Sequence, residues 1–148
     1  MTFPYAQQNS DSRRKLTALV HRLTDAELAR TTEYGWTVAA LLAHLAFWDH
    51  RMSVILKRWQ TEGLDPSAID SAAVNDALKV ICHALEPRTA AELAISAAEK
   101  IDTELDLLSA EFVQQIEAHA EATGTQFRMN RSLHRESHIN DIEALLNK

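Results

Sequence analysis

Apolar side chains recur at spacings of three and four residues along most of the chain, the pattern of helices that bury one face. The clearest run follows spacings of four, three, four, three and four: Leu41, Leu45, Trp48, Met52, Ile55 and Trp59. Thr37 can cap the start of this helix, and Gly63 is a suitable residue just beyond its end. The pattern predicts a long helix over residues 37–62 with one face turned toward other helices.

Further segments show the same helical spacing: residues 11–23, 71–85, 89–108, 112–120 and 130–146. Two Thr-x-x-Glu sequences, at Thr24 and at Thr89, have the spacing of a capping box and are each expected to begin a helix. Pro87 is expected to end the helix before it. No segment alternates as a strand does, so the sequence predicts an all-α fold, a four-helix bundle with short additional helices in the connections.

Length and composition agree with one domain over residues 1–148. The chain is 46% hydrophobic, with only three glycines and three prolines, and has no low-complexity linker or internal repeat. The formal charge of −6 disfavours nucleic acid and anionic membranes as partners. The cluster Arg13-Arg14-Lys15 is interpreted as the solvated side of a helix.

A cytoplasmic location is expected, because the N-terminus lacks a charged region followed by an apolar stretch. The longest apolar run, residues 38–48, is too short to cross a bilayer. Cys82 is the single cysteine and cannot form an internal disulfide, and we interpret it as a buried core residue.

Three histidines are the candidates for chemistry. His134 and His138 are four residues apart, so on a helix they point to the same side, flanking its apolar arc. His44 flanks the apolar seam of the 37–62 helix in the same way. Buried imidazoles need partners, and either a shared metal ion or three separate hydrogen bonds could supply them. Three ligands with positions left open would be the arrangement of a catalytic metal site.

The other histidines are interpreted as surface or boundary residues: His21, His50, His83 and His119. Helical phase places Asp141 near the candidate site, where it could orient an imidazole, and places Glu136 away from it. Trp48 lies one turn after His44 and could line a pocket.

Two segments of the chain resemble the DinB-like superfamily, which includes thiol-dependent S-transferases and the N-terminal domain of mycothiol-dependent maleylpyruvate isomerase. They are Gly-Trp-Thr-Val-Ala-Ala-Leu-Leu-Ala-His-Leu-Ala-Phe-Trp-Asp at residues 35–49 and His-Arg-Glu-Ser-His-Ile-Asn-Asp-Ile at residues 134–142. The resemblance implies a four-helix bundle, often a homodimer, with a zinc or nickel ion on His44, His134 and His138.

For function, the resemblance implies transfer of a low-molecular-weight thiol to an electrophilic small molecule, in detoxification or stress response. A coordinated thiol is deprotonated near neutral pH, and the thiolate is the nucleophile. Two alternatives stay open. One is a hydrolase that uses metal-bound water at the same three histidines, and the other is a non-catalytic helical binding protein.

Overall fold

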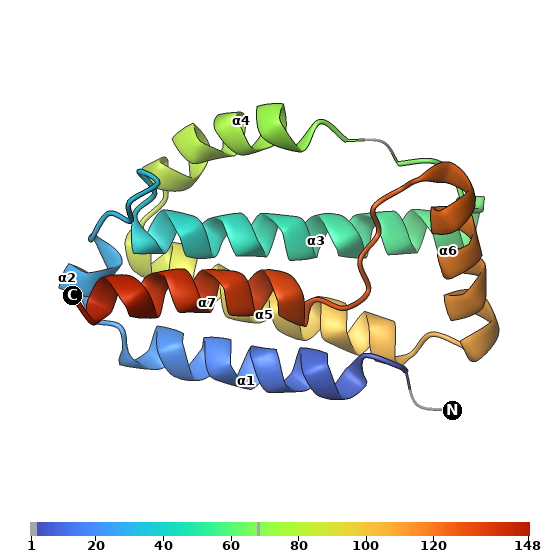
Figure 1. Cartoon of the computed structure of the whole chain (residues 1–148), viewed down its shortest axis with the longest axis horizontal. Helices are drawn as coiled ribbons and strands as arrows, with labels where there is room; N and C mark the ends of the chain where they lie inside the picture. The colour runs from blue at the N-terminus through green and yellow to red at the C-terminus, as the bar shows by residue number, and fades with distance from the viewer. Residues whose placement is uncertain (1–2, 68) are drawn as a thin grey trace.

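The computed structural model describes residues 3–67 and 69–148, and in these residues it contains seven helices and no strand (Figure 1). The helices are α1 (Ala6–Arg22), α2 (Asp25–Leu28), α3 (Val38–Glu62), α4 (Ser71–Ala84), α5 (Pro87–Asp106), α6 (Ala110–Thr123) and α7 (Ser132–Leu146). The prediction of an all-α bundle with short connecting helices is confirmed.

Four long helices, α1, α3, α5 and α7, lie side by side and form the body of the molecule (Figure 1). α3 and α5 run in the same direction, and α1 and α7 run in the opposite one. α4 returns along the outside of α3 and so makes the long crossover that a parallel pair needs. None of the described helices is both long and apolar enough to cross a membrane.

The predicted ends of the central helix are those observed. The Thr37 hydroxyl accepts a hydrogen bond from the Ala40 amide at the start of α3, and Gly63 ends the helix with a φ of 93°. That backbone angle is open to glycine at little cost. The capping box of Thr24 and Glu27 at the start of α2 is likewise present.

The predicted start of the fifth helix was wrong. Glu86, not Thr89, caps α5, and its carboxylate accepts hydrogen bonds from the Arg88 and Thr89 amides. Pro87 occupies the first turn of α5, where its missing N–H costs nothing and its fixed φ suits the helix. Pro87 therefore both follows α4 and begins α5. The Thr-x-x-Glu pattern at Thr89 had pointed to a later start.

The first helix also begins earlier than predicted, at Ala6 instead of Asp11. Phe3 is buried in the core just before it, and Asn9 is buried within its first turns. The Asn9 side-chain amide donates to the carbonyl of Met129. These contacts with a distant part of the chain stabilise a turn whose own sequence is polar.

A polar layer crosses all four long helices and divides the apolar core into two clusters. One cluster includes Leu45, Ala98 and Ile139 among its members, and the other includes Met52 and Ile101. The layer between them consists of buried side chains from α1, α3, α5 and α7: Asn9, Ser12, Asp49, Asp102 and Arg135.

Arg135 is the centre of this layer and is fully buried. Its guanidinium donates to both Asp102 oxygens, at 2.8 and 2.9 Å, and to Asp49 at 3.2 Å. Burial alone would lower the pKa of Arg135, but the charges and hydrogen bonds of the two aspartates raise it. Arg131 donates to Asp49 at 2.8 Å. Arg13 donates to Asp102, so its interpretation as a purely solvated residue was wrong.

An apolar groove of about 480 Å³ lies between α3, α4 and α5. Ile81 and Leu85 belong to the apolar spacing that predicts a helix with a buried face over residues 71–85, yet they line this groove with 60% and 37% of their surface exposed. The reason is that α4 packs chiefly against α3. This contact buries Leu78 and Cys82 and leaves the rest of the apolar face of α4 uncovered. The Cys82 thiol is buried, as predicted, and burial raises its pKa.

Candidate metal centre

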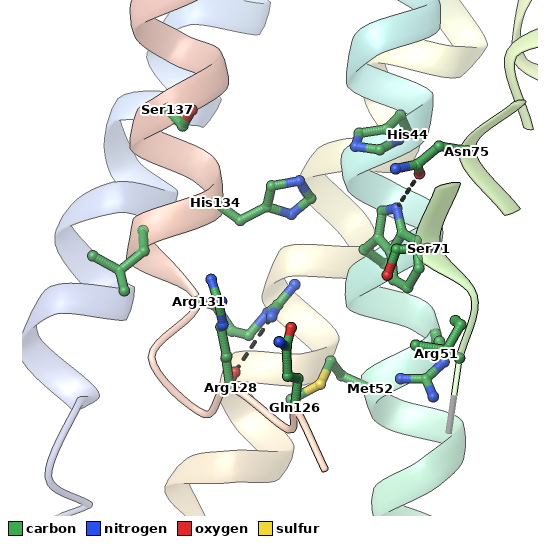
Figure 2. Close-up of a pocket in the computed structure, with 13 residues that line it drawn as sticks. His44, Arg51, Met52, Ser71, Asn75, Gln126, Arg128, Arg131, His134 and Ser137 are labelled. Atoms are coloured by element: carbon green, nitrogen blue, oxygen red, sulfur yellow. Dashed lines mark hydrogen bonds between the residues drawn. The ribbon is translucent and has the colours of Figure 1, made fainter. Parts of the chain in front are cut away.

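The fold brings the three candidate histidines together, although His44 and His134 are 90 positions apart in the sequence. One nitrogen from each of His44, His134 and His138 lies within 4.8 Å of the others. His44 comes from α3, and the other two come from successive turns of α7, which packs beside α3. The ring centroids are 4.9 to 5.3 Å apart. Figure 2 shows His44 and His134 pointing toward each other across the site.

His44 is the most constrained member of this triad. It is only 7% exposed, and its Nδ1 atom has no hydrogen-bond partner among the described residues. A buried polar atom without a partner costs free energy, and such atoms are rare in folded proteins. Separate hydrogen bonds to protein groups therefore do not describe His44 in the described residues. The convergence of one nitrogen from each ring makes a shared ion the better description of the three histidines.

The environment favours the neutral form of two of the imidazoles. Burial, with a smaller contribution from His138, lowers the pKa of His44 to about 4. Burial lowers the pKa of His134 further, to about 2, and the positive charges of His138, Arg131 and Arg128 add to the effect. Neutral imidazole is the form that binds a metal ion, so protons compete weakly for these two ligands.

Asp141 orients the third imidazole, as the helical phase predicted. Its carboxylate accepts a hydrogen bond from His138 Nδ1 at 3.0 Å, which leaves Nε2 for the triad. Histidine ligands commonly donate their other ring N–H to a carboxylate in this way. Glu136 points away from the triad, as predicted, and pairs with Lys15 at 2.8 Å.

Two pockets meet at the triad. The first, of about 420 Å³, is lined by three arginines, and we call it the arginine pocket (Figure 2): His44, Trp48, Arg51, Met52, Ile69, Ser71, Asn75, Gln126, Arg128, Arg131, Leu133, His134 and Ser137. The second, of about 470 Å³, has aromatic walls, and we call it the aromatic pocket: Thr32, Tyr34, Trp36, Leu41, His44, Asn75, His134, Ser137, His138 and Asp141.

Four residues line both pockets, and two of these belong to the triad. Molecules in either pocket can therefore reach the three histidines. Trp48 lines the arginine pocket, as its position had suggested, and its indole N–H donates to the Asn75 side chain at 3.0 Å. Trp36 packs edge-on against His44, with 5.2 Å between ring centroids, in the aromatic pocket.

Sequence reasoning did not find the polar layer that supports the triad. Arg135 directly follows His134, and Asp49 lies five residues after His44, so the layer holds α3 and α7 in register just beneath the histidines. One residue could have indicated this layer. Asp49 directly follows the apolar run of α3, and a carboxylate buried on such a helix needs a cationic partner. The remaining four histidines are exposed or at the boundary, as predicted.

These features define an all-α bundle whose interior carries a three-histidine cluster that could hold a metal ion. The family model of the DinB superfamily matches residues 8–136, and the chain therefore belongs to this superfamily. His44 and His134 fall within the matched segment, and His138 lies two residues beyond it. A search of curated proteins and one of solved structures each returned no match.

Proposed function

We propose that the protein is a metal-dependent enzyme that transfers a low-molecular-weight thiol to an electrophilic small molecule. The observation that carries the proposal is the convergence of His44, His134 and His138 inside the bundle, where His44 is buried and its Nδ1 has no hydrogen-bond partner among the described residues. Three imidazoles suit zinc or nickel among the divalent transition metals. Three protein ligands leave coordination positions open, as in catalytic sites.

Each part of the site has a definable task in such a reaction. The ion, when bound, would lower the pKa of a coordinated thiol and so supply a thiolate at neutral pH. Asp141 holds His138 in the orientation that presents Nε2. The positive charges of Arg128 and Arg131, which already act on His134, also favour an anionic sulfur beside it. Trp36 and Leu41 give the aromatic pocket an apolar wall that can contact the second substrate.

The two pockets favour transfer between two substrates over hydrolysis. A group-transfer reaction needs the donor and the acceptor at the metal together, each held by its own surface. The arginine pocket and the aromatic pocket provide two such surfaces on either side of shared residues. A hydrolase, in which water is the second reactant, needs only one of them.

The test is a thiol titration of cobalt-substituted protein. We expect about one ion per chain, and a thiolate-to-cobalt charge-transfer band when 2-mercaptoethanol is added at millimolar concentration. Apparent affinity should rise with pH toward the pKa of the free thiol, because coordination releases the thiol proton. The variant His44→Ala should lose both the ion and the band.

The matched control is His21→Ala, which removes an exposed histidine from α1 and should change neither signal. Cobalt-loaded protein that gives no band at millimolar thiol would exclude the transferase. Ester or amide hydrolysis that follows one ionisation near neutral pH, with thiols acting only as inhibitors, would instead establish the hydrolase. Retention of the ion by both His44→Ala and His138→Ala would exclude the metal site and leave the non-catalytic binding protein.

A further inference from the structure

The arginine pocket has a charge opposite to that of the whole chain. The protein carries a formal charge of −6, yet three arginines and no acidic residue line this pocket among the described residues. The aromatic pocket, on the other side of the triad, has the reverse composition, with Asp141 and neither arginine nor lysine. The arginine pocket is therefore the side of the triad that favours an anionic ligand.

The arginines differ in how their charges are balanced. Arg131 is paired with the buried Asp49 at 2.8 Å. Arg51 and Arg128 have no carboxylate within salt-bridge distance in the described parts of the chain. Two guanidinium charges at this pocket are thus left without an acidic partner from residues 3–67 and 69–148.

The two unbalanced arginines come from opposite sides of the pocket (Figure 2). Arg51 projects from α3 and is held in place: it donates to the Ser67 hydroxyl at 2.9 Å, and its guanidinium carbon lies 5.9 Å from the Trp48 ring centroid. Burial lowers the pKa of Arg51, which marks the cost of desolvating its charge. Arg128 is exposed and comes from the segment before α7. An arginine held by packing and hydrogen bonds is preorganised to bind a planar anion.

Uncharged polar groups complete the pocket. The side chains of Gln126 and Ser71 line it together with the arginines. The first amides of α7 are not free to bind an anion, because those of Arg131 and Ser132 already donate to the Asn9 side-chain oxygen at 2.7 and 3.2 Å. The volume of about 420 Å³ lies within the range of sites for small molecules.

We propose that the arginine pocket binds the anionic group, a carboxylate or phosphate, of a small-molecule substrate, with Arg51 and Arg128 as the residues that select it. The substrate's uncharged reactive end then extends to His44 and His134, while the second substrate occupies the aromatic pocket. That the bound molecule is a substrate rests on the proposed function, whereas binding of its anionic group requires only the pocket. Arginine suits both kinds of anion because its planar fork donates two parallel hydrogen bonds.

The test is calorimetric titration of the purified 148-residue chain with three probes: succinate, inorganic phosphate and the neutral diamide of succinate. We expect succinate or phosphate to bind, the diamide not to bind, and the affinity to fall as salt is added. Arg51→Gln and Arg128→Gln should each weaken binding by about tenfold, roughly the contribution of one charge-assisted hydrogen bond. Whichever anion shows these losses identifies the group recognised.

The matched control is Arg58→Gln, the same change on an exposed position of the same helix, and it should leave affinity unaltered. His138→Ala separates this inference from the proposed function, since His138 is in the triad but does not line the arginine pocket. That variant should keep the anion affinity even where it loses the ion. No binding of either anion at millimolar concentration, or binding unchanged by both arginine variants, would overturn the inference.

Discussion

Replacing Arg135 by methionine tests whether the polar layer holds the bundle together. The change removes a fully buried guanidinium and leaves the carboxylates of Asp49 and Asp102, 3% and 1% exposed, without their common partner. Breaking a buried ion pair from one side costs about 3–5 kcal/mol, because a charge stays buried without compensation. Arg131 and Arg13 still contact one aspartate each, so we expect the lower end, about 3 kcal/mol.

Urea unfolding followed by circular dichroism measures this loss. With a denaturant dependence of roughly 2 kcal/mol per molar, the midpoint should fall by roughly 1.5 M. Arg13→Met is the matched control, since Arg13 contacts the same Asp102 from a position that is 28% exposed, and it should cost less than about 1 kcal/mol. Because Arg135 directly follows His134 on α7, Arg135→Met should also weaken metal retention.

A second substitution shows whether the cost arises from charge. Adding Asp102→Asn to Arg135→Met removes one of the stranded carboxylates, so the double variant should regain part of the lost stability. If Arg135→Met has the wild-type midpoint, or if the double variant is no more stable than Arg135→Met, the layer does not act through buried charge.

Three further predictions concern the site and the surface. Metal-free protein should become less stable as pH falls from about 6.5 to about 4, because the unfolded chain takes up a proton on His44 before the folded one does. His44 should account for about 3 kcal/mol of the loss measured by urea unfolding across this window, and His134, whose pKa is lowered further, should add a loss of similar size; His44→Ala should remove the first part. Asp141→Asn should weaken metal affinity by roughly 10-fold to 100-fold in competition with a chelator, since His138 loses its carboxylate. We also propose a homodimer through the apolar groove; light scattering should give twice the 16.6 kDa of one chain, and Ile81→Glu should give the monomer mass.

The helices and the triad could be predicted because both depend on local periodicity. Leu41, Leu45 and Met52 mark the buried face of α3 by spacing alone, and that face fixes the phase of His44. His134 and His138 share a side of α7 for the same geometric reason. Local spacing does not show which helix packs beside α3. Inward-facing imidazoles need polar partners, however, and an apolar bundle offers few besides one another and a shared ion.

The polar layer could not be predicted in this way because its partners are far apart in sequence. Asp102 and Arg135 are separated by 33 positions, and each alone has the character of a surface residue. The exposed face of α4 is a second example, since apolar spacing at Ile81 and Leu85 predicts burial without showing which surface would provide it. Spacing identifies the face of a helix, and tertiary packing decides whether that face is covered.

The polar layer has a consequence for ion supply. Arg135 and Asp49 hold α3 and α7 together through protein groups alone, so an ion that reaches the triad enters a site that folding has already built. The ion selectivity of such a site does not come from folding around a particular ion. It follows the intrinsic affinity of neutral imidazoles, which is higher for copper than for nickel and zinc. We therefore expect any metal found in purified protein to follow the medium in which the cells grew, and each ion should be reconstituted separately before activities are compared.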